Sequence, residues 1–221
     1  MEHVTFTPHP DTASLGGLQA LLQRAVALDP AALARFQRIG DALNIYVTTP
    51  FDCVAARRVE AAVSRDGAAV RAQELFAAFR RLQPPPTPET PLHLGASHDA
   101  SWPGALPPAE QFVLRDEVPI SVARQLADEG KRLAKQFSGP AGPPRSLLDA
   151  TVITADADSG DPVEVPMRMV FTCTALGLIP GFEAPAHIPR HLRVATAGRW
   201  VRLDAPYGSV FKNAGLGLLV G

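Results

Sequence analysis

The stretch PMRMVFTCTALGL, residues 166–178, decides how the second half of this chain folds. Its leading proline favours the start of a helix. The residues that follow leave almost no polar face, and Arg168 is the only charge among them. A helix that is apolar on all sides is normally a buried one. We therefore expect residues 166–178 to form the centre of a hydrophobic core.

Strand-like runs lie on both sides of this helix. Before it, residues 151–165 can form a hairpin around an acidic, glycine-containing turn. After it, residues 191–204 predict a second hairpin, whose strands meet at Ala197-Gly198. The last nine residues, 213–221, are uncharged and rich in glycine, which is typical of a loose tail.

Further upstream, residues 112–118 predict an edge strand and residues 119–137 predict the clearest helix of the chain. A short helix is expected to begin at Ser146. The apolar residues of the long helix that we expect to be buried are Val122, Leu126, Leu133 and Phe137. The order of elements over 110–212 is similar to that of a winged-helix module, although a hairpin separates the two helices where a helix-turn-helix has a tight turn.

The first part of the chain also has the pattern of a folded unit. Apolar residues at helical spacing predict helices at 15–28, 33–39 and 70–82, with Asp29-Pro30 separating the first two. Residues 43–48 are rich in β-branched and aromatic residues and predict a strand, and after the interruption at Pro50 residues 51–63 could pair back on it. A mixture of this kind predicts an α+β fold.

Residues 84–108 contain eight prolines, which predicts polyproline-II or irregular structure. We therefore expect an α+β protein of two lobes joined by a proline-rich segment, the second lobe winged-helix-like as one possibility. The predicted parts are an N-terminal α+β lobe at 1–83, a proline-rich linker at 84–109, and a C-terminal α+β lobe with a terminal β-hairpin at 110–221.

Composition limits the partners and the compartment. The chain has 221 residues, 21 basic against 22 acidic, so it lacks the overall positive charge of a dedicated nucleic-acid binder. It has only two cysteines, and its first residues do not resemble a signal peptide. No apolar run reaches the roughly 20 residues that span a bilayer. We expect a cytoplasmic protein with no membrane association, from a bacterium, because lysine is rare and Ala, Arg, Pro and Val are abundant.

Two short motifs look catalytic by their letters alone. Residues 97–99 read Ser-His-Asp, but a catalytic triad converges in space and consecutive loop residues do not usually do so. Residues 215–217 read Gly-Leu-Gly, but a dinucleotide site needs a helix after the glycines and the sequence stops at 221. We expect neither motif to act, and we predict no cofactor.

Two other groups resemble metal sites. His187 and His191 have the spacing of a helical metal pair, but Pro185 and Pro189 interrupt any helix there. The acidic turn 156–161 lacks the glycine and glutamate register of an EF-hand. We therefore predict no metal.

One local feature suggests binding. Residues 187–212 contain five Lys or Arg and a single carboxylate, on strands that alternate apolar and polar positions. A strand pair that carries arginines and a tryptophan can lie on phosphates, and it can equally be a solvated face. The candidate nucleic-acid contacts are Arg193, Arg199, Trp200, Arg202 and Lys212.

Three hypotheses for function follow. The first is a non-enzymatic regulatory or interaction protein that binds another macromolecule, most often another protein or a second copy of itself. The second is nucleic-acid binding through the C-terminal hairpin. The third is an enzyme with an active site between the lobes that no motif reveals. Its candidate residues are Asp52, Arg57, Arg58 and Glu60, or Asp149 and Arg168.

Overall fold

The computed structural model describes residues 3–9, 13–81, 91–137, 143–155, 162–181, 183–185 and 187–213. The chain divides into two compact units. Unit 1 consists of Met1–Pro50 and Val54–Ala109, and unit 2 consists of Phe51–Cys53 and Glu110–Gly221. The acidic turn expected at 156–161 and the tail expected beyond residue 213 lie outside the described residues.

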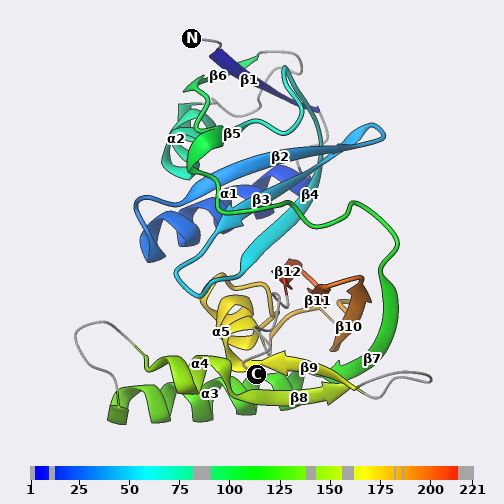
Figure 1. Cartoon of the computed structure of the whole chain (residues 1–221). Helices are drawn as coiled ribbons and strands as arrows, with labels where there is room; N and C mark the ends of the chain where they lie inside the picture. The colour runs from blue at the N-terminus through cyan, green and yellow to red at the C-terminus, as the bar shows by residue number, and fades with distance from the viewer. Residues whose placement is uncertain are drawn as a thin grey trace, which may run out of the picture. The chain divides into compact units, whose positions relative to one another are not determined.

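Unit 1 combines an antiparallel sheet with two helices (Figure 1). Its elements are β1 (His3–Pro8), α1 (Ala13–Leu28), β2 (Leu33–Ile39), β3 (Ala42–Thr48), β4 (Val54–Val63), β5 (Ala69–Arg71), α2 (Ala72–Arg81) and β6 (Leu92–Ala96). The strands β5-β2-β3-β4 lie side by side in that order, and β1 pairs with both β4 and β6. The helices α1 and α2 pack on each other and on this sheet.

Aromatic residues from distant parts of the sequence meet in the core of unit 1. The ring of Phe6 lies 6.0 Å from Phe36 and 5.5 Å from Phe79, measured between centroids. Phe6 and Phe36 have no exposed surface. Offset and edge-on contacts of this kind add to the free energy that burial itself contributes.

Residues 33–39 are a strand, so the helix predicted there is wrong. Phe36 pairs with Ile45 of β3, and β2 is also paired with β5 on its other side. Gly40, expected to end a helix, instead has a φ of +58° in the two-residue turn that leads into β3. The Asp29 carboxylate accepts a hydrogen bond from the Ala31 amide in the turn that follows α1. Pairing on both edges has overridden a local helical pattern.

The proline-rich linker is also wrong for the residues described from 91 onward. This stretch contains β6 and a 3-10 turn at Asp99–Ser101. The Asp99 carboxylate accepts hydrogen bonds from the Ala69 amide (2.7 Å) and from Arg65 (2.5 Å). Trp102 is buried, with the Arg35 guanidinium 5.7 Å from its ring centroid. The segment is therefore an integral part of unit 1.

Unit 2 has its own antiparallel sheet, in the order β12-β11-β10-β7, and a separate two-stranded sheet of β8 and β9 (Figure 1). Its elements are β7 (Val113–Pro119), α3 (Ile120–Phe137), α4 (Arg145–Asp149), β8 (Thr151–Ala155), β9 (Val163–Pro166), α5 (Met167–Ala175), β10 (His191–Ala197), β11 (Trp200–Ala205) and β12 (Gly208–Asn213). The hairpin predicted at 191–204 is confirmed as β10 and β11, whereas β12 has no counterpart in the sequence analysis.

The prediction that residues 166–178 are interior is confirmed. Every residue of 167–173 is buried, including Arg168 at 4% exposure. The helix α5 contacts α3, α4, β9 and β12. Since it is covered by elements on several sides, it cannot lie in a DNA groove as a recognition helix does. The winged-helix arrangement expected for this lobe is therefore wrong, although the α+β class holds.

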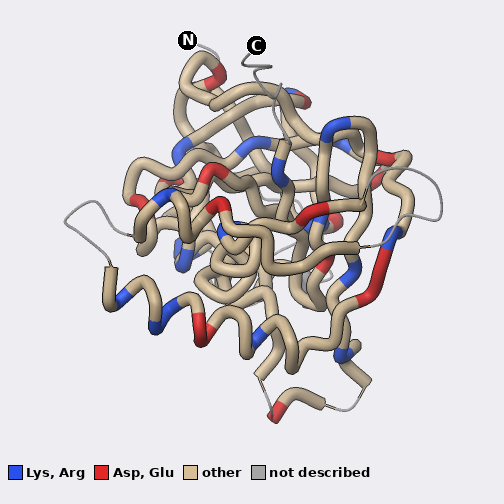
Figure 2. Tube along the Cα trace, turned by 60° about the horizontal axis from the view of Figure 1, so that its bottom comes forward, with Lys and Arg blue, Asp and Glu red and all other residues tan. Residues whose placement is uncertain are grey.

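The buried face of α3 also differs from the prediction. Val122 and Phe137 are 40% and 66% exposed, and Leu126 and Leu133 are half-buried. The fully buried positions are the small residues Ala123, Ala127 and Gly130. Gly130 allows close approach to α5, because a Cβ there would lie 2.7 Å from the Phe171 ring. The outward residues of α3 carry charges of both signs, with Asp128 and Glu129 between Arg124 and the cluster Lys131, Arg132 and Lys135 (Figure 2).

Candidate functional site

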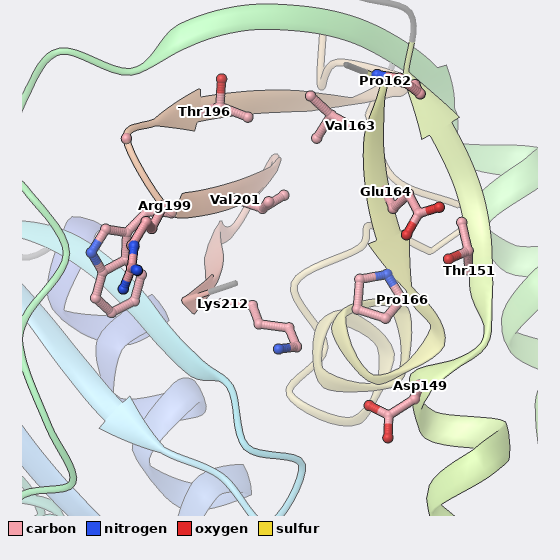
Figure 3. Close-up of a pocket in the computed structure, with 12 residues that line it drawn as sticks. Asp149, Thr151, Pro162, Val163, Glu164, Pro166, Thr196, Arg199, Val201 and Lys212 are labelled. Atoms are coloured by element: carbon pink, nitrogen blue, oxygen red, sulfur yellow. The ribbon is translucent and has the colours of Figure 1, made fainter. Parts of the chain in front are cut away.

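A pocket in unit 2 lies between the β8–β9 sheet and the ends of the strands β10–β12 (Figure 3). Its volume is about 460 Å³, which falls in the range of sites for small molecules or short protein segments. One wall is formed by Asp149, Thr151, Pro162, Val163, Glu164 and Pro166. The facing wall is formed by Thr196, Gly198, Arg199, Trp200, Val201 and Lys212.

Strand register explains which β10–β12 side chains reach the pocket. Thr196 is paired with Val201, and Val201 with Lys212, so the three side chains point to one face of the sheet. Two positions further along the strands, the same face bears the fully buried Val194 and Leu203. The pocket therefore continues the core of unit 2 outward, and its lining changes from apolar to polar where the strands end.

The tight turn between β10 and β11 supplies the rest of this wall. Gly198 has a φ of +54°, a left-handed conformation that other residues adopt at a cost. The turn places the exposed Arg199 and the half-buried Trp200 beside the cavity. The Arg199 side chain has no hydrogen-bond or ion-pair partner among the described residues. A cation without a local partner is available to a ligand.

Asp149, on the opposite wall, is bound by the buried cation Arg168. Arg168 donates hydrogen bonds to the carboxylates of Asp149 and Asp52, the latter at 2.8 Å, and to the carbonyl oxygen of Phe51 at 2.9 Å. Its side chain is 5% exposed, whereas those of Asp52 and Asp149 are 79% and 58% exposed. Burial alone would lower the pKa of Arg168, but the two carboxylates raise it above its ordinary value. Arg168 is therefore a permanent cation that fixes Asp149 at the pocket rim.

Two of the predicted nucleic-acid contacts lie away from the pocket. Arg193 and Arg202 occupy the sheet face opposite Lys212. Arg193 lies 3.4 Å from the carboxylate of Glu117. Arg202 pairs with Asp204 at 2.9 Å, and its guanidinium lies 4.3 Å from the centroid of the Phe112 ring. The structure thus brings Arg199 and Lys212 together at the pocket, away from Arg193 and Arg202. Trp200 also borders the pocket, but its position in β11 is on the sheet face that bears Arg202.

The residues suggested for a catalytic cleft are paired with neighbours inside their own units. Asp149 and Arg168 bind each other, as described above. In unit 1, Arg58 donates to Asn44, and the Glu60 carboxylate lies 3.7 Å from His9.

The remaining motifs also have structural settings. Asp99 of the Ser-His-Asp run binds Ala69 and Arg65, as described above, and the His98 amide donates to the Ala69 carbonyl. His191 lies 3.7 Å from Glu117. In the part of the chain that is described, no three His, Cys, Asp or Glu side chains are grouped so that they could hold a metal ion. The same residues contain no helix long and apolar enough to cross a membrane.

Sequence reasoning missed Glu164 at this pocket, and it named Asp149 only as a candidate for an active site between the lobes. Glu164 lies on β9 and Asp149 at the end of α4, more than 30 residues before Arg199. Nothing in the local pattern links these positions. The available signal was the predicted 151–165 hairpin, which places Glu164 on an exposed strand next to the buried helix.

Two family models cover the chain. Residues 107–217 match the domain of unknown function DUF8185, and residues 2–104 match the domain of unknown function DUF8010. No curated protein matches the sequence.

Solved structures with the same fold are DNA polymerase sliding clamps. The Caulobacter crescentus pol III beta structure is 14% identical with a TM-score of 0.55, and it is matched over 96% of this chain and 65% of its own. The Bacillus subtilis sliding clamp is 12% identical with a TM-score of 0.55, over 96% and 64%. The Helicobacter pylori beta clamp bound to a DNA ligase peptide is 11% identical with a TM-score of 0.51, over 96% and 66%.

At these identities the likeness concerns the fold alone. The chain spans about 65% of the length of the clamps that it matches. The two-lobe arrangement with a winged helix is therefore replaced by a sheet-rich α+β fold that matches the sliding clamps. Because the DUF8185 model covers half of the sequence, the chain belongs to that family of unknown function.

Proposed function

We propose that this chain is a non-enzymatic protein that binds a segment of another protein in the pocket of unit 2. The observation that carries the proposal is the pocket lining. Apolar lining residues such as Val201 and Pro166 lie beside charged groups, and Arg199 and Glu164 have no side-chain partner among the described residues. Sites for protein segments combine apolar contact area with a few polar groups that fix orientation.

The fold supports the same class of function. One of the clamps with this fold was solved with a DNA ligase peptide bound. The position of a peptide on that clamp is not transferred to this chain, because the identity is only 11%. The pocket is assigned on its own chemistry, and the clamp shows only that the fold is compatible with holding a peptide.

Affinity capture with matched variants tests the proposal. Tagged wild-type chain, the double variant Arg199→Glu/Lys212→Glu and the control Arg193→Glu are used to capture partners from lysate at near-native abundance. A true partner should be retained by the wild type and the control and should bind the double variant at least tenfold more weakly when purified. The proposal fails if the captured proteins are the same for all three forms, or if none is enriched.

Self-association is tested in the same preparations. A second copy of this chain belongs to the same class of partner. Sedimentation velocity over a range of concentrations distinguishes it, because only self-association shifts the distribution of the purified wild type on dilution. Loss of that shift in the double variant alone would assign the pocket to a second copy.

Nucleic-acid binding is the second candidate, favoured by the presence of the two cations Arg199 and Lys212 at one site. It ranks below protein binding because Arg193 and Arg202 are paired with carboxylates on the other sheet face. Duplex and single-stranded DNA should be retarded at low salt. Changing Arg199 and Lys212 to alanine should then lower the salt slope by about one per lost phosphate contact. Absence of retardation at low salt would exclude this candidate.

A further inference from the structure

Among the residues that the structure describes, strand β9 has an unpaired edge, and this edge faces the pocket. It pairs with β8 on one side only, in a sheet of two strands. Figure 3 shows Pro162, Glu164 and Pro166 along one strand, between the cavity and Thr151 of β8. Between the prolines, residues 163–165 make no backbone hydrogen bonds within the described part of the chain except those to β8. In an antiparallel pair, alternate residues direct their N–H and C=O groups away from the partner strand. Such an edge is a template for a further strand.

Nothing in the described residues on the far wall completes that edge with main-chain groups. Thr196, Val201 and Lys212 reach the cavity as side chains on one face of the β10–β12 sheet. The gap between β9 and this face is the pocket of about 460 Å³. The four residues of β9 span about 13 Å, and a neighbouring strand would lie about 4.8 Å away. An extended segment of about four residues therefore matches the length of the free edge.

The charged residues that line the pocket indicate which side chains such a segment would carry. Arg199 and Lys212 place two cations on the wall that faces β9. Within the described part of the chain, the hydrogen bond of Lys212 is a local one, at 3.3 Å to the carbonyl oxygen of Asn213. Of the two carboxylates at the pocket, Asp149 is bound to Arg168. Glu164 is exposed on β9, and it alternates with the buried Val165. An acidic side chain on the incoming strand would pair with the cations and lie across from β9.

We propose that β9 receives an extended segment of a partner protein as a third strand, and that an acidic side chain of this segment pairs with Arg199 and Lys212. The proposal rests on the proposed function and specifies how the pocket would be used. Strand addition to a sheet edge is a general mode of peptide recognition, in which main-chain hydrogen bonds supply affinity and side-chain contacts supply specificity.

Random 12-residue peptides displayed on phage, selected on the full chain, provide a defined probe. The enriched sequences should contain Asp or Glu next to β-branched or aromatic residues. A synthetic enriched peptide should bind Arg199→Glu at least tenfold more weakly than wild type. It should bind the control Arg193→Glu within twofold of wild type, because Arg193 lies on the opposite sheet face.

Amide hydrogen exchange measured by NMR gives a second readout that does not depend on a variant. Peptide binding should slow exchange at least tenfold either at Glu164, or at both Val163 and Val165, since only one of these sets faces away from β8. The amide protection of β8 should change little, because its pairing with β9 is already made.

The results separate this inference from the proposed function. If a captured partner or an enriched peptide depends on Arg199 but leaves β9 exchange unchanged, the strand-addition proposal is overturned and the proposed function stands. Enriched peptides without acidic residues also overturn the proposal. If no peptide is enriched and no partner is captured, both fail. Protection of β9 that depends only on protein concentration would assign the edge to a second copy of this chain and overturn the proposal.

Discussion

Replacing Gly130 with alanine should destabilise the protein, although the same substitution usually stabilises an exposed helix. A Cβ at this position would lie 2.7 and 2.8 Å from Cε1 and Cζ of Phe171 and 2.9 Å from Cε of Met167. Carbon atoms pack best at about 3.5–4.0 Å, so the overlap is about 1 Å. Since α3 contacts α5 here, relief of the overlap requires α3 to shift or the buried side chains to leave their rotamers.

The net effect follows from two opposing contributions. Overpacking of a core position costs about 1–3 kcal/mol. Replacing glycine in a helix interior by alanine gains about 0.5–1 kcal/mol. We expect a net loss of about 1 kcal/mol, which lowers the Tm of a chain of this size by about 2–4 °C.

Gly16 on α1 is the matched control, because no atom lies within 4 Å of a Cβ built there. Gly16→Ala should raise the free energy of unfolding by about 0.5–1 kcal/mol. Thermal and urea unfolding, followed by circular dichroism, measure both variants. The further change Phe171→Leu in the Gly130→Ala background should restore part of the loss. The packing argument is refuted if Gly130→Ala is as stabilising as Gly16→Ala.

Three other predictions concern charges and thiols. Burial would raise the pKa of Asp99, but the Ala69 amide and Arg65 outweigh it and lower that pKa. Asp99→Asn should therefore reduce unfolding free energy above about pH 4, the ordinary pKa of an aspartate, and the difference from wild type should vanish as pH falls through the lowered pKa. A difference that stays constant down to pH 2 in urea unfolding would contradict this reasoning. Arg168→Met should lower the free energy of unfolding by about 2 kcal/mol. The loss is modest because both partner carboxylates are largely exposed and can be rehydrated. An unchanged urea midpoint would be inconsistent with this prediction. Burial raises the pKa of Cys53 to about 12 and also raises that of Cys173. Thiol reagents at pH 8 should therefore label the native protein only as fast as local unfolding exposes the two thiols. Rapid stoichiometric labelling would disprove their burial.

The sequence predicted α5 correctly because its apolar character is the same on every side. Such a helix has to be buried whatever its neighbours are. The same reasoning failed for α3, where the expected face was defined by large apolar residues. Phe171 and Met167 of α5 leave no room for a side chain at position 130, and the inward face of α3 carries the small residues Ala123, Ala127 and Gly130. The choice of face depended on a partner that the local pattern does not contain.

Strand pairing between distant segments explains the other errors. Leu33, Phe36 and Ile39 have helical spacing, but β2 lies between β3 and β5 and its residues are fixed by both. Likewise β6 pairs with β1 at the other end of unit 1. Prolines indicated where regular structure is interrupted, but they could not indicate a partner strand almost ninety residues away.

For the candidate site, the sequence pointed to Arg199, Trp200 and Lys212 through the local excess of basic residues. It also grouped Arg193 and Arg202 with them. The alternation of side chains along the β10–β11 hairpin does not predict a third strand, and it is the pairing of β12 with β11 that places Lys212 on the sheet face opposite Arg193 and Arg202. The role of all five in nucleic-acid binding stays a prediction. The sequence named Asp149 but could not place it beside Glu164, because Asp149 ends α4 and Glu164 lies on β9, which folds back along β8.

The assignment of Phe51–Cys53 to unit 2 has a consequence for how such chains are made and recombined. Asp52 and its partner Arg168 are 116 residues apart in the sequence. During synthesis, residues 51–53 emerge long before α5. Because these three residues belong to unit 2, residues 110–221 cannot complete that unit without them. A gene fragment cut at residue 110 would encode a C-terminal half without that tripeptide. Exchange of this half between relatives should therefore succeed best when residues 51–53 are inherited along with it.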